Sequence, residues 1–268
     1  VAQFSILNAV WAATIVLAEV PSGALADIIG RKQLLVFATS IMIIEIGIIS
    51  FIPKTDPSII FIVFLINRVL SGLAEAAASG ADEAIAYDSL EAEGDKRQWG
   101  RVLEILMRFQ SFGFIIAMSV GAAIYDPNLL ESVCRFFDLD TNFSQETTMR
   151  FPLYLTFILA ICAFITTLRM DDPHKNSPSS DAKKPEIRQA FSLTLKAGLW
   201  ILKTPFALCV ILFGMLFDGI IRMVITLSSQ YYRMIELPES TFGIIGSLVA
   251  MFGLVVPKIA KKITENHS

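Results

Sequence analysis

Charged side chains near the middle of long apolar segments are the residues of this chain most able to do chemistry. They are Glu45, Arg68, Asp218 and Arg222. An ionised group at the centre of a segment that crosses a lipid bilayer costs about 2.5–3.5 kcal/mol, so it generally faces a charged partner or a water-filled cavity. Such groups hold ions or carry protons. We therefore take them as candidates for substrate binding or proton coupling.

Each of these groups also has a plainer interpretation. Asp218 and Arg222 stand at positions i and i+4 and share one helix face, where they can neutralise each other. Arg68 can pair with Glu75, two helical turns further on, and Glu75 is therefore a candidate as well. Glu45 has no evident partner in its own segment. We expect a neutral, protonated side chain packed against another helix, with proton carriage as the alternative.

A polar turn between two apolar segments carries the pattern Gly-x-x-x-Asp-x-x-Gly-Arg-Lys. Its members are Gly23, Asp27, Gly30, Arg31 and Lys32. The first glycine permits a close helix approach, and the second can take a positive φ at the end of a helix. The two cations favour the cytoplasmic side of a membrane. An ordinary basic turn would explain the cations, but not the aspartate and the glycines at this spacing.

The elements that position these residues are apolar segments long enough to cross about 30 Å of hydrocarbon. Apolar residues make up 54% of the chain and charged residues 18%. The mean hydropathy of +0.61 is too high for a soluble domain. About seven segments qualify as spans: 1–20, 33–53, 58–80, 101–125, 151–169, 205–228 and 241–257.

Lysine and arginine are unevenly distributed over the gaps between these segments. Gaps rich in basic residues alternate with gaps that hold few, namely Lys54, Arg135, Arg150 and Arg233. The positive-inside rule assigns the richer set to the cytoplasm. With an odd number of spans, the first residue then lies outside and the last residue inside.

Other kinds of site have little support. The cysteines Cys134, Cys162 and Cys209 are far apart, and His174 and His267 are lone residues in polar segments. The sequence therefore indicates no disulfide framework, no metal site and no polar catalytic cluster of a membrane enzyme. We expect no catalytic residue, no metal and no cofactor. A net charge of −3 gives no indication of nucleic-acid binding.

The polar turn from Gly23 to Lys32 resembles the signature loop between the second and third transmembrane helices of the major facilitator superfamily of transporters. The pattern Arg68-x-x-x-Gly72 is similar to a second motif of that family, on its fourth helix, where the arginine faces the central cavity. The resemblance implies an all-α, polytopic transmembrane helix bundle of bacterial type. On this count the segments are helices two to eight of twelve, and the chain is a fragment.

The same resemblance divides the chain. Residues 1–169 are the N-terminal half with helices two to six, 170–204 the cytoplasmic central loop, and 205–268 the start of the C-terminal half with helices seven and eight. The longest basic polar stretch follows helix six on this count, as the family requires. Apolar residues recur at helical spacing from Pro185 on, which predicts an amphipathic helix on the inner membrane surface. The outer loop 126–150 is unusually long for the family.

By similarity to the family, an acid about four helical turns after the motif arginine joins the signature loop in a cytoplasmic charge network. Asp82 fits that position. We therefore predict a latch of Asp27, Arg31 and Asp82 that holds the inner gate shut in the outward-open state. Other acids nearby are expected to be solvated charges at a helix end: Glu83, Asp88, Glu91 and Glu93.

The function that the resemblance implies is secondary active transport of a small solute by alternating access, without covalent chemistry. We expect proton-coupled efflux across the bacterial inner (plasma) membrane, by a monomer whose partners are its substrate, protons and the lipid bilayer. Helix five lacks the Gly-Pro motif of the drug/proton antiporters, so antiport has no support from that motif. The alternatives are a uniporter or importer of the same fold, and a transport-inactive receptor or scaffold.

Overall fold

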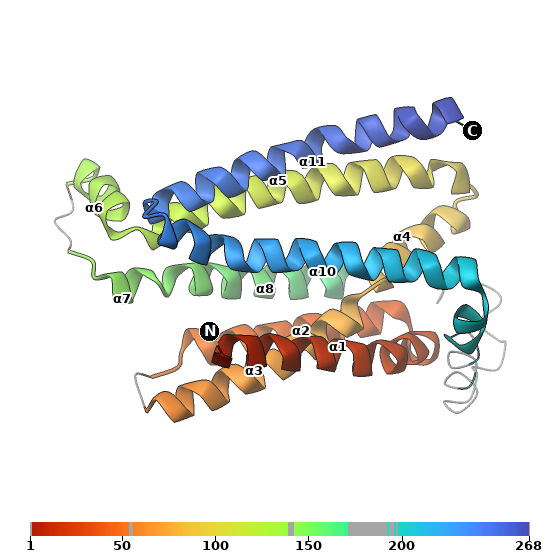
Figure 1. The fold of residues 1–268 in the computed structure, drawn as a ribbon, viewed down its shortest axis with the longest axis horizontal. Helices are drawn as coiled ribbons and strands as arrows, with labels where there is room; N and C mark the ends of the chain where they lie inside the picture. Colours follow the sequence, from red (N-terminus) through yellow and green to blue (C-terminus); the bar gives the residue numbers. More distant parts are fainter. Residues whose placement is uncertain are drawn as a thin grey trace. The chain divides into compact units, whose positions relative to one another are not determined.

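The computed structural model describes residues 2–53, 56–138, 142–170, 192, 196 and 198–267. The described residues form helices and no strands, which confirms the predicted all-α class (Figure 1). The helices are α1 (Ala2–Ile29), α2 (Arg31–Ser50), α3 (Pro57–Ala78), α4 (Ala81–Ala92), η1 (Lys96–Gln98), α5 (Trp99–Tyr125), α6 (Pro127–Phe136), α7 (Gln145–Thr148), α8 (Phe151–Arg169), α10 (Pro205–Met234) and α11 (Glu239–His267).

Among the described residues, six helical stretches are long and apolar enough to cross a membrane. They are Gln3–Ala26, Arg31–Ser50, Pro57–Ala92, Trp99–Tyr125, Gln145–Arg169 and Pro205–Met234, and they correspond to the first six predicted segments. The seventh segment is helical within α11, but its apolar part, Thr241–Val256, is shorter than the other six. Large apolar side chains are widely exposed along these helices, and Phe206 on α10 is 80% exposed. This distribution fits helices whose solvent is lipid.

Two helices begin with the same pair of residues, an aspartate followed by a proline. The carboxylate of Asp56 accepts a hydrogen bond from the backbone N–H of Ser58 at 2.8 Å, and Asp126 accepts one from Asn128 at 2.9 Å. In each case proline occupies the first helical turn, where its missing N–H has no intrahelical partner to lose. The sequence therefore determines where α3 and α6 start.

Two glycines with positive φ separate consecutive helices. Gly30 has φ 97° and lies between α1 and α2, which confirms the positive φ predicted for it. Gly80 has φ 71° and lies between α3 and α4. Other residues rarely adopt this region of backbone conformation without strain. The second break has consequences for the predicted latch, because α4 is a new helix and not a continuation of α3.

The chain forms two compact units, the first made of Val1–Lys96 with Leu153–Cys209 and the second of Arg97–Pro152 with Val210–Ser268. In the first unit, α3 packs against both α1 and α2, and α2 also contacts α4. Small side chains allow these helices to approach, as in the buried cluster of Leu34, Ala38 and Ala77.

Helix α8 contacts α2 within the first unit at two places. The hydroxyl groups of Thr39 and Thr167 are 3.1 Å apart and share a hydrogen bond. Nearer the other end of both helices, the ring of Phe51 stacks on Tyr154 and meets Phe157 edge to face. Polar and aromatic contacts thus fix α8 against α2 at two levels.

In the second unit, α5 and α11 run side by side (Figure 1). A Cβ added at Gly243 of α11 would lie 2.5 Å from the carbonyl oxygen of Met118 on α5 and would also clash with Ala122. The hydroxyl groups of Ser119 and Ser247 are 3.0 Å apart across the same contact. The two backbones therefore approach closely, in the manner of membrane helices that pack through small residues.

The two long connections are described to different extents. The amphipathic helix predicted for the central loop lies largely outside the described residues. Within this loop, the described residues 198–203 are helical. The loop 126–150, which is predicted to lie outside, contains the short helices α6 and α7. Its backbone is therefore folded over much of its length.

Candidate functional site

A carboxyl group is buried inside the second candidate span. Glu45 of α2 is 8% exposed and lies against Asn67 of α3, which is 3% exposed. The side-chain amide of Asn67 donates to the backbone oxygen of Glu45 at 3.0 Å and to its Oε2 at 3.1 Å. Glu45 is thus packed against another helix, as expected from its lack of a partner in its own segment.

The neighbours of this carboxyl group come from successive turns of α3. The hydroxyl group of Ser71 and the charges of Arg68 and Glu75 act on the carboxyl group of Glu45. We refer to Glu45, Asn67, Arg68 and Ser71 as the Glu45 cluster. Its members bring an acid, a cation and two neutral polar groups together within the first unit, at a depth where both helices are otherwise apolar.

The alternative pairing of Arg68 with Glu75 does not occur. No ion pair joins these two residues in the part of the chain that the structure describes, and Glu75 is exposed. The physical reason is the arrangement around Arg68, which is half-buried and has the carboxyl group of Glu45 as a source of opposite charge on the neighbouring helix. The charge of Arg68 thus acts across helices, on the carboxyl group of Glu45.

Gly72 has a packing explanation in the structure. A Cβ at this position would lie 2.8 Å from the Cβ of Thr14 and 3.0 Å from the backbone oxygen of Trp11, both on α1. Any side chain here would push α1 away from α3. Since Gly72 is one turn beyond Arg68, the close contact of α1 also limits the space on that side of the motif.

Arg31 of the predicted latch pairs with a different acid. Nη1 of Arg31 donates to the carboxylate of Asp88 and, at 3.0 Å, to the backbone oxygen of Ala84. Asp82, the predicted partner, is exposed, and its carboxylate accepts a hydrogen bond from the N–H of Glu83 at 2.8 Å. The prediction of a contact between Arg31 and Asp82 is therefore wrong, as is that of a solvated Asp88.

The helix break explains this difference. Gly80 starts a new helix, so a count of turns from the motif arginine along one continuous helix does not apply to residues after it. Ala84 and Asp88 are one turn apart on α4 and share a face, whereas Asp82 lies on another side of the same helix. The side chains of Arg31 and Asp88 are 29% and 13% exposed, so their ion pair is largely shielded from water.

The other residues of the polar turn have different surroundings. Gly23 was expected to allow a close helix approach; nothing among the described residues lies within 4 Å of the position that a Cβ would take there, and that expectation stays a prediction. Lys32 is half-buried. The side chain of Asp27 lies outside the described part of the chain, and its predicted place in the latch stays a prediction.

The second unit contains the other charged pair inside an apolar span. Nε of Arg222 donates to Oδ2 of Asp218 at 2.7 Å, one turn apart on α10, which confirms the predicted pairing. Their side chains are 52% and 60% exposed. The pair neutralises itself but is not enclosed by the described residues around it. That it shares a cavity with Arg68, which belongs to the first unit, stays a prediction.

Two functional candidates were not identified from the sequence, Asn67 and Asp88. Asn67 directly precedes Arg68 in an apolar span, and an amide at that depth needs a hydrogen-bond partner. That signal was available. Asp88 had no such signal, because several acids surround it in the sequence and only the fold of α4 distinguishes them.

Comparison with known proteins agrees with this architecture. A family model described as Major Facilitator Superfamily matches residues 1–266, almost the entire chain. No curated protein and no solved structure matches it. The match extends over the polar turn with Arg31, the Glu45 cluster and the six apolar helical stretches. The chain is a multi-pass membrane protein and belongs to the major facilitator superfamily of membrane transporters.

Proposed function

We propose that this chain is part of a secondary active transporter that exports a small solute by alternating access, with protons as the coupling ion. The observation that carries this proposal is the Glu45 cluster, in which a buried carboxyl group on α2 lies among polar and charged groups of α3. A transporter that couples to protons needs an acid that water reaches in only part of the cycle. Glu45 is 8% exposed in this structure, which is the shielded condition that such an acid must have in part of the cycle.

Arg68 is the group that would connect the proton to the solute. An ionised Glu45 inside the span would be costly without a counter-charge, and Arg68 is the cation whose charge acts on it. When Glu45 is protonated, that attraction is lost and Arg68 is released for another anion. Proton binding and the position of Arg68 are thereby coupled, which is the requirement for coupled transport.

Asp218 and Arg222 form the second candidate group, on the helix that begins the C-terminal half. Ionised side chains more than half exposed in the middle of an apolar span are costly against lipid. We therefore place them, together with Arg68, on one water-accessible cavity between the two halves of the complete transporter. The ion pair between Asp218 and Arg222 lowers the free energy of placing two charges in the span. It is compatible with a role in solute binding.

The contact of Arg31 with Asp88 is proposed to hold the inner gate closed in one state of the cycle. It ties the start of α2 to α4, two helices otherwise joined by small apolar contacts such as Leu35 with Ala81 and Ile85. Charge-assisted contacts are strong enough to bias a conformational equilibrium and weak enough to break in each cycle.

The test uses the full-length transporter in inverted membrane vesicles, with a pH-sensitive dye and a panel of small amphipathic anions as trial solutes. Glu45→Gln keeps the size and the hydrogen bond to Asn67 but cannot release a proton. We expect it to lose uphill, gradient-driven transport while retaining exchange of solute across the membrane. Arg68→Ala should abolish gradient-driven flux, and Arg68→Lys should keep part of it, because lysine keeps the charge but not the planar fork.

The matched control is Glu83→Gln, which changes an exposed acid on α4 outside the Glu45 cluster. It should transport like the wild type. Wild-type uphill transport by Glu45→Gln would exclude this carboxyl group as the proton carrier. Solute flux that ignores the proton gradient in the wild type would indicate a uniporter, and an absence of flux for every solute would favour the receptor or scaffold.

A further inference from the structure

Helix α6 lies at the boundary of a membrane span. The candidate span of α5 ends at Tyr125, and α6 begins at Pro127 after the single capping residue Asp126. The next candidate span begins at Gln145. The chain therefore leaves and re-enters the apolar region within this loop, and α6 starts where lipid headgroups surround the end of α5.

The surface of α6 is divided into three stripes. The first is half-buried, contains Pro127, Leu130, Glu131 and Cys134, and is consistent with the contact of α6 with α5. The second is exposed and polar and consists of Asn128, Ser132 and Arg135. The third is exposed and apolar and consists of Leu129, Val133, Phe136 and Phe137. These sets follow i, i+3, i+4 and i+7 spacings, so each occupies its own side of the helix.

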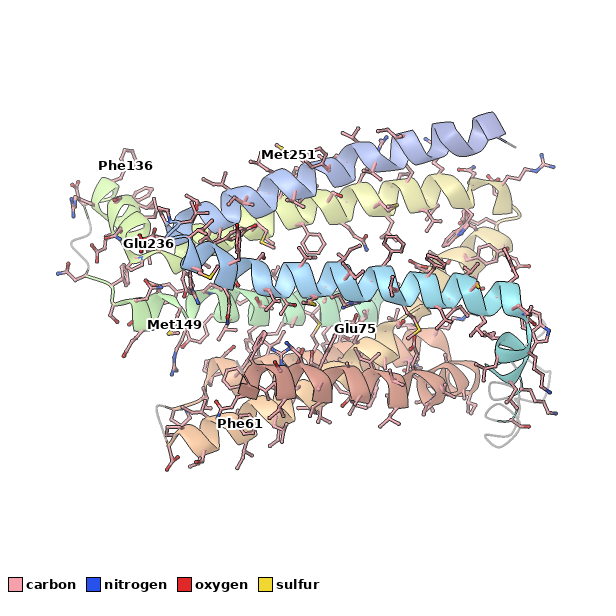
Figure 2. The ribbon with its side chains drawn as sticks, in the orientation of Figure 1. Phe61, Glu75, Phe136, Met149, Glu236 and Met251 are labelled. Carbon is pink, nitrogen blue, oxygen red and sulfur yellow. The ribbon has the colours of Figure 1, made fainter. Side chains whose placement is uncertain are left out.

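The apolar stripe has no partner among the described residues and projects strongly. Phe136 is 83% exposed and Phe137 67%, and Figure 2 shows Phe136 at the outer edge of α6. Their rings meet edge to face at 5.4 Å between centroids, so they present one aromatic surface. Aromatic side chains are enriched at the level of the lipid headgroups.

We propose that α6 lies on the bilayer as an interfacial helix, with Leu129, Val133, Phe136 and Phe137 inserted among the lipids and the polar stripe facing water. Lipid is the occupant that the position of the helix favours, because α6 starts only one residue after the end of a candidate membrane span. Its alternation of an apolar and a polar side is the pattern of helices that lie in the plane of a membrane.

A second observation fixes the orientation of the helix. Glu131 of the half-buried stripe accepts a hydrogen bond from the backbone N–H of Phe143 at 2.8 Å. The ring of Phe143 in turn contacts Phe151 at the start of α8, with 6.0 Å between centroids. The loop thus contacts α6 on its half-buried stripe. A rotation of α6 that covered the apolar stripe would break this contact.

A protein partner fits this surface less well. A stable protein interface covers about 800 Å² on each partner and involves about 20–30 residues a side. The exposed apolar stripe has only its four side chains, on a helix of 10 residues. Insertion into lipid needs no such area, because every inserted side chain is surrounded by acyl chains.

The test places an environment-sensitive fluorophore on single cysteines of the full-length protein, with Cys134, Cys162 and Cys209 changed to serine. Labels at Val133 or Phe136 report on the apolar stripe, and a label at Ser132 is the matched control one residue away. The protein is reconstituted into phosphatidylcholine vesicles that carry a nitroxide high on the acyl chain. Iodide is the aqueous quencher.

We expect several-fold stronger quenching by the lipid nitroxide at Val133 and Phe136 than at Ser132, and the reverse order for iodide. Iodide quenching of all three labels to the same extent would mean that the stripe faces water and would overturn the proposal. Protection of Val133 and Phe136 from both quenchers would mean that protein covers the stripe, which would also overturn it. The two apolar positions are tested independently, so distortion by one label does not decide the outcome.

Discussion

The ion pair between Arg31 and Asp88 leads to a prediction that needs no knowledge of the transported solute. Asp88→Asn removes the negative charge but keeps the size of the side chain. Since Arg31 also donates to the backbone oxygen of Ala84, the substitution weakens the contact of α2 with α4 without abolishing it. We expect α4 to open away from α2 more often, while the rest of the first unit stays folded.

The magnitude follows from the surroundings of the pair. A hydrogen bond to a charged group contributes about 1.5–3 kcal/mol to stability. The partial exposure of Arg31, 29%, favours the lower part of this range. A loss of about 1.5–2 kcal/mol increases the population of the open form about 10- to 30-fold, because every 1.4 kcal/mol is a factor of ten.

Hydrogen–deuterium exchange of the full-length protein in nanodiscs measures this opening. The exchange rate of the amides of α4, Ala81–Ala92, is proportional to the population of the open form when closing is fast. We expect it to rise by the same factor in Asp88→Asn. Asp82→Asn is the matched control on the same helix and removes an acid from its first turn, which contributes only about 0.3–1 kcal/mol. Its effect should stay below about fivefold.

A double mutant tests whether the two side chains act together. If they do, Arg31→Gln combined with Asp88→Asn should be little worse than the more damaged single mutant. Unchanged exchange of α4 in Asp88→Asn would refute the reasoning, as would an equal effect of Asp82→Asn. A general rise in exchange over α1 to α3 would show that Asp88 supports the whole unit and is not a local latch.

Three further predictions concern packing, pairing and topology. Gly72→Ala should destabilise the protein by about 1–3 kcal/mol and lower its thermal unfolding midpoint, because its Cβ meets α1, whereas Gly113→Ala, with nothing within 4 Å, should not. The double mutant Asp218→Asn/Arg222→Gln should lose less stability than the sum of the single mutants, measured by the same unfolding midpoint, and strict additivity would contradict the observed pair. A cysteine at Asn142, which is exposed, should react with an impermeant thiol reagent in intact cells; labelling only after permeabilisation would invert the predicted topology.

The membrane-spanning helices could be predicted from the sequence because length and hydropathy alone determine them. The same holds for local features that depend on neighbours within one turn, such as the pair of Asp218 with Arg222 and the positive φ of Gly30. Asp218 and Arg222 are so near in sequence that helical geometry leaves little freedom in which residues can pair. The positive φ of Gly30 depends on that residue's own backbone.

Contacts between helices could not be predicted in the same way. Glu45 meets Asn67 across α2 and α3, and no pattern in either segment specifies the register of one helix against the other. Which glycine allows close packing also depends on the register of one helix against another. A Cβ at Gly72 would meet α1, whereas a Cβ at Gly23 would meet nothing within 4 Å among the described residues. The helix break at Gly80 changes the direction in which every later residue of α4 points relative to α3. For this reason the acid that pairs with Arg31 is Asp88 and not Asp82.

The contact of α5 with α11 also sets a condition on how the protein is made. Ser119 and Ser247 are 128 positions apart, so α5 is complete long before its partner leaves the ribosome. At about 5–20 residues per second this delay is roughly 6–26 seconds. During that time α5 resides in the bilayer with its serine hydroxyl and the backbone of Met118 uncovered on one face. The insertion machinery or a temporary neighbouring helix must therefore cover this face of α5 until α11 is inserted. A substitution in α11 that prevents the contact would leave α5 uncovered and accessible to quality control at this late step of biogenesis.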